Sequence, residues 1–394
     1  MPKSNKISNK IYLDHASATP VDETVLKIMQ NVAKENFANA GAIHEEGVSS
    51  EKILSQNKEE VAQILGAHAD EIVFTSGATE SNNLAILGIV QKNNLHIVTT
   101  NIEHASVLET CKYLETKNVE VTYVPVEENG IVNPEKIRKA LKKNTVLVSV
   151  MYANNEIGTI QSIKEIAKVI RNFNKVNSTK VLFHTDATQA MNYLPINVEK
   201  LGVDLLSLNS GKIYGPKGVG LLYVKRKTVI QKIMHGGEQE FNLRPGTENI
   251  PLVVGFTLAL KITEKMKEKE VKRLTILRDY FFNKLNHSGI LKNTRMIVNG
   301  SVVERLPNNV NITISKIPSD LLVIELSAKG IYASEKSACK SGDKKASHVI
   351  QALREGETEG SLRFSLGRST TKKDIDYTIK TLEQILTKLS KWYT

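Results

Sequence analysis

The chain has 394 residues, of which 41% are hydrophobic and 24% are charged. This composition fits one large subunit with an ample core, or two domains that share a cleft. No run of about eighteen apolar residues is present, which excludes a membrane-spanning helix, and the polar, basic N-terminus argues against a secretory signal. Two cysteines are too few for a disulfide framework, so we expect a cytoplasmic protein in a reducing compartment.

The formal net charge is +11, but lysine and arginine are scattered along the chain, mostly on the polar faces of predicted helices. Nucleic-acid binding surfaces usually gather such residues in one stripe with aromatic side chains between them. A solvated, lysine-rich surface is therefore the better interpretation, and we expect no direct nucleic-acid partner and no membrane partner. A basic face could still help to dock an acidic protein.

Short apolar runs alternate with helical periodicity over the first two thirds of the chain. Helical spacing is found at 21–32, 84–90, 107–114 and 134–141. Strands are expected from residue 11 and at 71–75, 96–100, 120–124, 145–151, 181–186, 203–208 and 219–224. This alternation predicts an α/β fold, with a mostly parallel central sheet flanked by helices.

A long helical stretch starts at Pro251, and from about residue 262 it becomes rich in lysine and glutamate. Strands are expected near 295–298 and 309–314, a helical run at 321–326, and a short extended segment at 331–333. Thr371 and Asp374 form a predicted capping box before a last amphipathic helix. We therefore expect a large domain at 16–261, and a smaller α+β domain formed by 1–15 and 262–394.

Polar residues follow several of the predicted strands. Ser76–Asn83 contains a glycine turn and a helix start, a combination that can bind an anion but also occurs as a plain cap. His104 follows the strand at 96–100, where imidazole can transfer protons near neutral pH or act structurally. Asn155 follows the strand at 145–151, and a turn role is equally adequate for it. Cys111 lies on a helical pattern and is expected to be a buried, unreactive thiol.

Asp186 and Lys212 follow two more of these strands. Ligands of an open α/β sheet bind beyond the carboxyl ends of its strands. A carboxylate and an amine are the pair that a pyridoxal phosphate site needs, because the lysine forms a Schiff base and the carboxylate keeps the pyridine nitrogen protonated. Without further context, two surface charges at strand ends are the commoner explanation.

The residues around this pair carry a family resemblance. Asp186-Ala-Thr-Gln189 and the stretch Lys-Ile-Tyr-Gly-Pro-Lys-Gly from Lys212 resemble the cysteine desulfurases of the class V aminotransferase group, and further motifs follow from Tyr12 to the last helix in the family's order. The resemblance implies pyridoxal phosphate as cofactor and the aspartate aminotransferase-like fold of its fold type I enzymes. We predict no metal site.

The resemblance also implies roles for individual residues. Lys212 carries the cofactor, Asp186 holds the ring nitrogen, His104 stacks on the ring and passes protons, and Asn155 lies beside the ring or the substrate carboxylate. The remaining cofactor-binding candidates surround the ring or its phosphate, and they are Ala78, Thr79, Gln189, Asn209, Ser210, Gly211 and Thr247. In the family the threonine at the position of Thr247 reaches the cofactor of a neighbouring subunit, so we expect a homodimer.

Three motifs depart from the family pattern, and in one of them, the cysteine loop, Lys336 replaces a glycine. Asn209-Ser210-Gly211 stands where relatives usually have Ser-Gly-His before the lysine. We therefore expect the phosphate to lose a hydroxyl and an imidazole as partners, unless Asn209 or Ser210 substitutes for them. The stretch from Phe37 to Gly47 has the length of a family loop near the site but keeps only Asn39, His44 and Gly47 of its pattern. Asn39 is taken as a substrate-binding candidate.

The stretch Ser334–Lys345 is polar, contains one glycine and has no apolar periodicity, which predicts an exposed, mobile loop. It displays Cys339 among several lysines that favour the thiolate, so this cysteine is a candidate nucleophile. The stretch is similar to the catalytic cysteine loop of the family, in the long-loop type that hands sulfur to a separate scaffold protein.

Arg363 lies in a Ser-Leu-Arg motif whose arginine, in the family, binds the substrate carboxylate, although a structural salt bridge is the alternative. Together these motifs predict a desulfurase that converts L-cysteine to L-alanine, forms a persulfide on Cys339 and supplies sulfur for iron-sulfur clusters or thiolation. Two alternatives stay open: a selenocysteine lyase or other class V lyase, and a catalytically impaired adaptor that binds cofactor and a scaffold protein.

Overall fold

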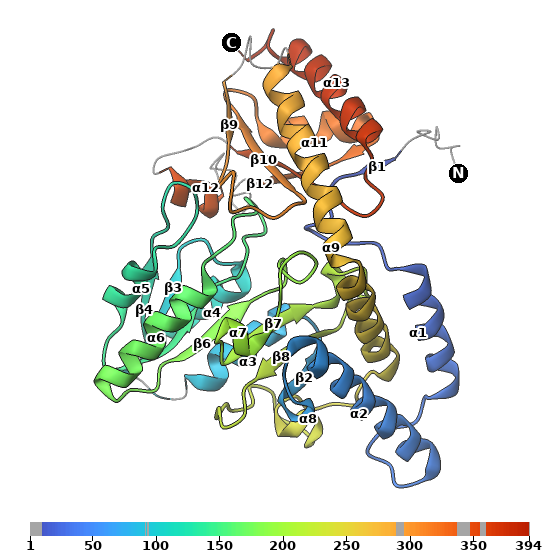
Figure 1. The fold of residues 1–394 in the computed structure, drawn as a ribbon, viewed down its shortest axis with the longest axis vertical. Coiled ribbons are helices and arrows are strands. Elements are labelled where there is room, and N and C mark those ends of the chain that lie inside the picture. Colours follow the sequence, from blue (N-terminus) through green and yellow to red (C-terminus); the bar gives the residue numbers. More distant parts are fainter. Residues whose placement is uncertain are drawn as a thin grey trace.

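The computed structural model describes residues 10–90, 92, 94–288, 295–336, 347–354 and 360–393. Two parts, each built around its own sheet, are joined by the long helix α9 (Ile250–His287), as Figure 1 shows. Within these residues no helix is long and apolar enough to cross a membrane.

The larger part contains a seven-stranded sheet in the order β2-β8-β7-β6-β5-β3-β4. Its strands are β2 (Ile72–Thr75), β3 (His96–Thr100), β4 (Glu120–Val124), β5 (Thr145–Ser149), β6 (Leu182–Asp186), β7 (Leu205–Asn209) and β8 (Gly220–Val224). All neighbours pair in parallel except β8, which runs antiparallel to both β2 and β7. The predicted α/β class with a mostly parallel sheet is confirmed.

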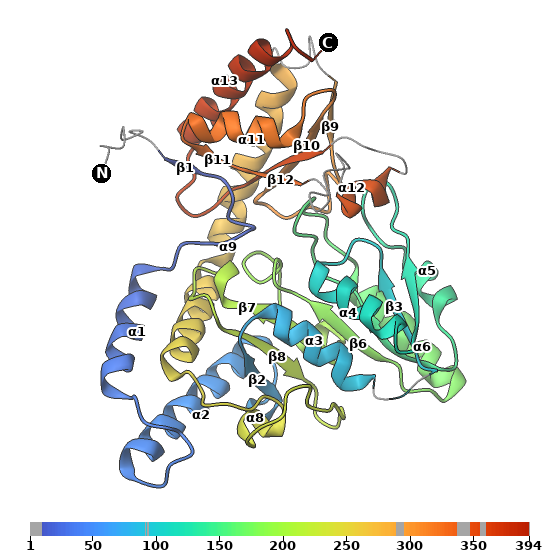
Figure 2. The same cartoon turned by 180° about the vertical axis from the view of Figure 1, so that it is seen from behind.

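Helices cover both faces of this sheet. On one face lie α3 (Ala78–Ile89) and α4 (Ala105–Glu115), and on the other α5 (Pro134–Ala140), α6 (Ile163–Asn177) and α7 (Val198–Leu201) (Figures 1 and 2). The strand residues alternate between two separate apolar cores, so that Val73 and Ile97 pack beneath α3 and α4, whereas Phe74 and Val98 face the other side. A sheet buried on both faces explains why its strands are continuous apolar runs in the sequence.

The remaining elements of the larger part lie outside the sheet itself. Helices α1 (Glu23–Glu35) and α2 (Glu45–Leu65) pack against α9. The short elements are the 3-10 turns η1 (Ala69–Glu71) and η2 (Ser210–Lys212), and α8 (Gln239–Asn242).

The smaller part has a four-stranded antiparallel sheet in the order β12-β13-β10-β9. Its elements are β9 (Met296–Val298), β10 (Asn309–Ile314), α11 (Ser319–Ala328), β11 (Ile331–Tyr332), β12 (Ser334–Lys336), α12 (His348–Leu353), β13 (Ser361–Ser365) and α13 (Lys372–Leu389). The N-terminal strand β1 (Ile11–Tyr12) pairs in parallel with β11, so the start of the chain belongs spatially with its end. The proposed division at residue 261 stays a prediction, since α9 runs across it without a break.

One expected loop begins as a strand. Ser334–Lys336 form β12, which pairs with β13 in the register Ser334↔Arg363, so the prediction of a loop from residue 334 is wrong for these three residues. The ladder bonds come from a strand almost thirty residues later in the chain, and a local pattern cannot reveal them. Cys339 and its neighbours at 337–346 lie outside the described residues.

The predicted capping box of the last helix is confirmed. Thr371 caps α13, its hydroxyl accepting from Asp374 N at 3.3 Å while Asp374 Oδ2 accepts from Thr371 N at 2.8 Å. These two bonds satisfy backbone donors that a helix start otherwise leaves open.

We expect Thr371→Ala to lower the free energy of unfolding by about 1 kcal/mol, because the Asp374 N–H loses its acceptor. Thr387→Ala is the control, since this exposed threonine on the same helix only donates to Glu383 O, and its effect should stay within about 0.5 kcal/mol. Urea unfolding followed by circular dichroism measures both, and equal midpoints for the two variants would contradict the role of the cap.

Candidate active site

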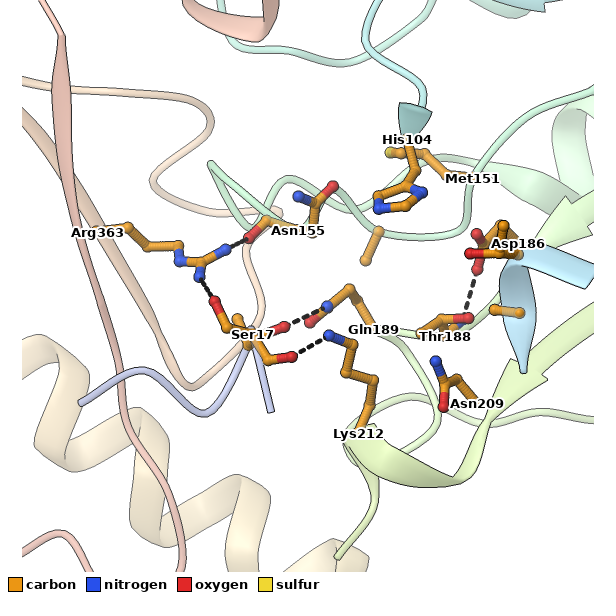
Figure 3. A pocket seen from close by; sticks show the side chains of 14 residues that line it. Ser17, His104, Met151, Asn155, Asp186, Thr188, Gln189, Asn209, Lys212 and Arg363 are labelled. Carbon is orange, nitrogen blue, oxygen red and sulfur yellow. Dashed lines mark hydrogen bonds between the residues drawn. The ribbon is translucent and has the colours of Figure 1, made fainter. Parts of the chain in front are cut away.

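A pocket of about 360 Å³ lies where the carboxyl ends of β5, β6 and β7, the residues after β3, and the start of α3 meet the smaller part (Figure 3). Its lining contains most of the residues singled out in the sequence: Ala78, Thr79, His104, Asn155, Asp186, Gln189, Asn209, Lys212 and Arg363. Side chains that are far apart in the chain therefore face one cavity.

Other candidates lie elsewhere. Ser210 and Gly211 are buried in η2 and do not line the pocket, whereas Thr247 is exposed. Asn39 is exposed too, and its Oδ1 accepts from Gly41 N at 2.8 Å. The assignment of Asn39 to substrate binding therefore stays a prediction, with no support from this pocket.

The pocket also includes residues that sequence reasoning missed. These are Ala16, Ser17, Met151, Ala153 and Thr188. Ser17 and Thr188 lie inside two motifs of the sequence, Tyr12 to Thr19 and Asp186 to Gln189. Their position within these motifs is the sequence feature that indicates them as pocket residues.

Asp186 is the last residue of β6, and it is 8% exposed. Its Oδ1 accepts from Thr188 N at 2.9 Å and its Oδ2 from Asn82 Nδ2 at 2.8 Å. Two donors are therefore aimed at this carboxylate in a nearly dry position. The pocket thus has a carboxylate held in place on the side formed by β6.

Lys212 ends η2, and its Nζ donates to Ser17 O. The backbone here is fixed from two sides, because Asn192 Nδ2 donates to Lys212 O at 2.5 Å and Thr19 Oγ1 donates to Gly211 O at 3.2 Å. The turn therefore directs the amine across the pocket toward the N-terminal segment, as Figure 3 shows.

Arg363 comes from β13 of the smaller part and is 1% exposed. Its Nη1 donates to Asn155 O at 2.6 Å, and its Nη2 donates to Asp14 Oδ1 at 2.7 Å and to Ser17 Oγ at 2.6 Å. Its buried Nε has no hydrogen-bond partner among the described residues. The guanidinium lies across the pocket from Asp186 in Figure 3, so the cavity has a cationic and an anionic side.

The chain on either side of 337–346 is attached beside this pocket. Before the gap, Ser334 is the ladder partner of Arg363. After it, Ser347 Oγ donates to Glu156 Oε2 at 2.7 Å, and the His348 ring lies 3.0 Å from Glu103 O. Glu156 and Glu103 are the sequence neighbours of Asn155 and His104, so the segment that contains Cys339 starts and ends at the rim of the site.

Two buried titratable groups lie beneath the pocket. Burial raises the pKa of Glu103 to about 8, although Thr100 and Met151 N donate to the carboxylate. Burial lowers the pKa of His184 to about 4, and its ring bonds Ser149 Oγ and Ser207 Oγ. Both groups are therefore held in their neutral forms at pH values where exposed counterparts would carry charge or begin to do so.

Comparisons with known proteins agree with this geometry. The model of the family "Aminotransferase class-V" matches residues 11–378, and the chain therefore belongs to that family. Within it, the chain is 41% identical to cysteine desulfurase IscS of Dictyoglomus turgidum, over 97% of this chain and 96% of that protein. It is 42% identical to cysteine desulfurase IscS of Methanosarcina thermophila, over 96% and 92% respectively.

A solved structure gives the same result for the fold. The structure of a NifS-like protein superposes with a TM-score of 0.88 at 34% identity, covering 97% of this chain and all of that one. The sequence resemblance to cysteine desulfurases of class V, and the fold it implies, are confirmed.

The raised pKa of Glu103 predicts a pH-dependent stability. Between about pH 4.5 and about pH 8, the folded state binds a proton here that the unfolded state has lost, so the free energy of unfolding falls as pH rises, by at most about 1.4 kcal/mol per pH unit. Glu103→Gln removes this titrating group. As pH rises from about 4.5 to about 8, the free energy of unfolding of the variant should therefore increase relative to that of the unmodified protein.

Urea midpoints measured from about pH 5 to about pH 8 test this expectation. Glu109→Gln is the control, because its exposed carboxylate pairs with Lys112 on the surface and should leave the pH slope unchanged. Parallel curves for Glu103→Gln and the unmodified protein would show that Glu103 does not titrate as expected.

Proposed function

We propose that this protein is a pyridoxal phosphate-dependent cysteine desulfurase, which converts L-cysteine to L-alanine and forms a persulfide on Cys339. The observation that carries the proposal is one pocket that joins Lys212, Asp186 and Arg363, in a chain similar over its whole length to cysteine desulfurases. An amine, a carboxylate and a guanidinium on different sides of one cavity suit an amino-acid substrate and a pyridine cofactor.

The residues of the pocket fit this cofactor. Thr188 Oγ1 in the lining is a buried hydroxyl with no hydrogen-bond partner among the described residues. The start of α3 adds backbone N–H groups and a helix dipole that favour a phosphate near Ala78 and Thr79. Lys212 would hold the carbonyl carbon of the cofactor and Asp186 its ring nitrogen. His104, Asn155, Gln189 and Asn209 would then border the ring.

When bound, pyridoxal phosphate supplies an electron sink for negative charge at the substrate α-carbon. The protein must hold the substrate and move its protons. Arg363 is suited to bind the substrate carboxylate, because its cation is already desolvated and oriented by Asp14, Ser17 and Asn155. Lys212 Nζ is the base that removes the α-proton, and its present acceptor, Ser17 O, keeps the amine on the substrate side of the pocket.

Cys339 is the proposed sulfur acceptor. The chain has two cysteines, and burial raises the pKa of Cys111 to about 12, which removes it as a nucleophile. The Cys339 thiolate attacks the substrate sulfur, a new S–S bond forms as the Cβ–S bond breaks, and the released electron pair returns to carbon. Protonation of that carbon then yields alanine. The chain is attached beside the pocket at Ser334 and Ser347, which supports the proposal that Cys339 can approach the substrate.

The partners follow from the same proposal. We propose a homodimer in which Thr247 serves the neighbouring subunit, and its segment is anchored at α3 by the Arg244–Glu80 pair at 3.1 Å. The persulfide would pass to a scaffold or other acceptor protein, for iron-sulfur cluster assembly or thiolation.

The first test of the function uses Cys339→Ser. Incubated with L-cysteine, the unmodified protein should form alanine and a protein-bound persulfide, whereas this variant should bind cofactor, with its yellow colour, but form no persulfide. Cys111→Ala is the matched control and should retain both products. Persulfide formation at an undiminished level in Cys339→Ser would reject the assignment of the nucleophile. Parallel assays with L-selenocysteine, comparing selenide with sulfide release, separate the desulfurase from a selenocysteine lyase.

A second test concerns the altered turn before Lys212. A Cβ at Gly211 would lie 3.5 Å from both Asn209 Oδ1 and Lys217 Cγ, which is ordinary contact, so a side chain fits at its base. We expect Gly211→His to bind pyridoxal phosphate at least about threefold more tightly, by adding a donor for the phosphate. Gly211→Ala controls for the added Cβ. Equal cofactor affinities of Gly211→His and Gly211→Ala in a titration would contradict our alignment of this turn.

A further inference from the structure

A continuous set of hydrogen bonds joins Asp186 to His104 through two residues that are not part of the pocket lining. Asn82 on α3 is completely buried, and its Nδ2 lies 2.8 Å from Asp186 Oδ2 and 2.8 Å from Ser106 Oγ. Ser106 Oγ in turn lies 2.8 Å from His104 Nδ1. Asn82 and Ser106 thus connect a pocket residue at the end of β6 with one that follows β3.

The orientation of the Asn82 amide is determined by its neighbours. If the amide were reversed, Oδ1 would face the Asp186 carboxylate, and two acceptors would repel each other. In the observed orientation Oδ1 is buried without a hydrogen-bond partner among the described residues. An unpaired buried carbonyl costs free energy, so the bonds made by Nδ2 are maintained at the expense of those that Oδ1 would make.

The hydrogens of this set can be counted. The Asn82 amide nitrogen has two hydrogens, one for Asp186 and one for Ser106 Oγ. The Ser106 hydroxyl therefore accepts from Asn82 and directs its own hydrogen to His104 Nδ1. Ser106 N also donates to His104 Nδ1, at 3.1 Å. With two donors directed at it, Nδ1 acts as an acceptor and carries no hydrogen.

From this count we propose that Asn82 and Ser106 are positioning residues, which hold His104 in the tautomer protonated at Nε2 and couple it to the Asp186 carboxylate. A second proton on Nδ1 would face the Ser106 N–H, so the arrangement favours a neutral imidazole that presents an N–H at its other nitrogen. Figure 3 shows the His104 ring at the pocket. The importance of this tautomer for turnover depends on the proposed function, whereas the tautomer itself does not.

The coupling has a chemical consequence for the proposed reaction. An imidazole held as the Nε2–H form can donate a proton from that nitrogen and take it back without rotating, since Nδ1 is anchored. The same amide that orients Ser106 also donates to Asp186. Loss of Asn82 would therefore remove a hydrogen-bond donor from the Asp186 carboxylate and, at the same time, weaken the hold on the His104 ring.

The test is ¹⁵N NMR of the full-length protein labelled at histidine, without added cofactor, with the His104 signals assigned through His104→Gln. Protonated and unprotonated ring nitrogens have well-separated chemical shifts. In the unmodified protein we expect Nδ1 unprotonated and Nε2 protonated. Ser106→Ala and Asn82→Ala should move the signals toward a mixture of tautomers, and Ser106→Thr, which keeps a hydroxyl, should restore them. Asn83→Ala is the matched control, because Asn83 connects the same two helices through Thr110 at 2.9 Å.

Activity provides the second measurement. With cofactor and L-cysteine, Ser106→Ala should lower kcat about tenfold, a part of what acid–base groups usually supply, and leave KM within about twofold, while Ser106→Thr recovers kcat. If Asn82→Ala does not fold, Ser106→Ala alone tests the proposal, because it removes only one hydroxyl and is the smaller change.

Three outcomes are informative. A proton on His104 Nδ1 in the unmodified protein, or signals unchanged in Ser106→Ala, would overturn the proposal whatever the activity. Signals that shift as expected together with the loss of kcat would support it. Signals that shift as expected in a protein that forms no alanine would support the hydrogen-bond arrangement and reject the proposed function.

Discussion

The site depends on the parallel pairing of β5, β6 and β7. The pairs Leu147↔Leu182 and His184↔Leu205 hold these strands in a register that ends them at one edge of the sheet. Since each strand delivers its next residues beyond that edge, Asn155, Asp186 and Lys212 meet there although long helical connections separate them. A shift of one residue in this register would exchange strand side chains between the two cores, whose packing differs, and would displace the residues at the strand ends.

The smaller part completes the pocket with a buried cation. Arg363 is almost fully desolvated, and its charge is balanced by Asp14 at 2.7 Å, a residue near the other end of the chain. Burying a guanidinium is costly unless it is paired and hydrogen-bonded, and loss of one partner leaves an uncompensated charge. The same contacts therefore tie the N-terminal segment, β13 and the turn at Asn155 together.

Reactive and unreactive groups are separated by burial. Cys111 and Glu103 lie within the sheet and its helices, where burial raises the pKa of each and keeps both groups uncharged. Asp186 is 8% exposed at the pocket and accepts from Asn82 and Thr188 N. Glu103 also accepts from Thr100 and Met151 N, so its raised pKa reflects its complete burial and not a lack of donors.

The sequence alone determined the alternation of strands and helices and the identity of the chemical groups. The strands His96–Thr100, Glu120–Val124 and Asn309–Ile314 have the predicted bounds, because apolar runs and turn residues are local signals. Family motifs identified Lys212, Asp186 and Arg363 before any contact was known. Only the tertiary structure decided that β8 runs antiparallel, that β1 pairs with β11, that Ser334–Lys336 form a strand, and that Asn82 and Ser106 join Asp186 to His104. These features depend on hydrogen bonds between residues distant in the chain, and such pairings leave no periodicity in the segments that make them.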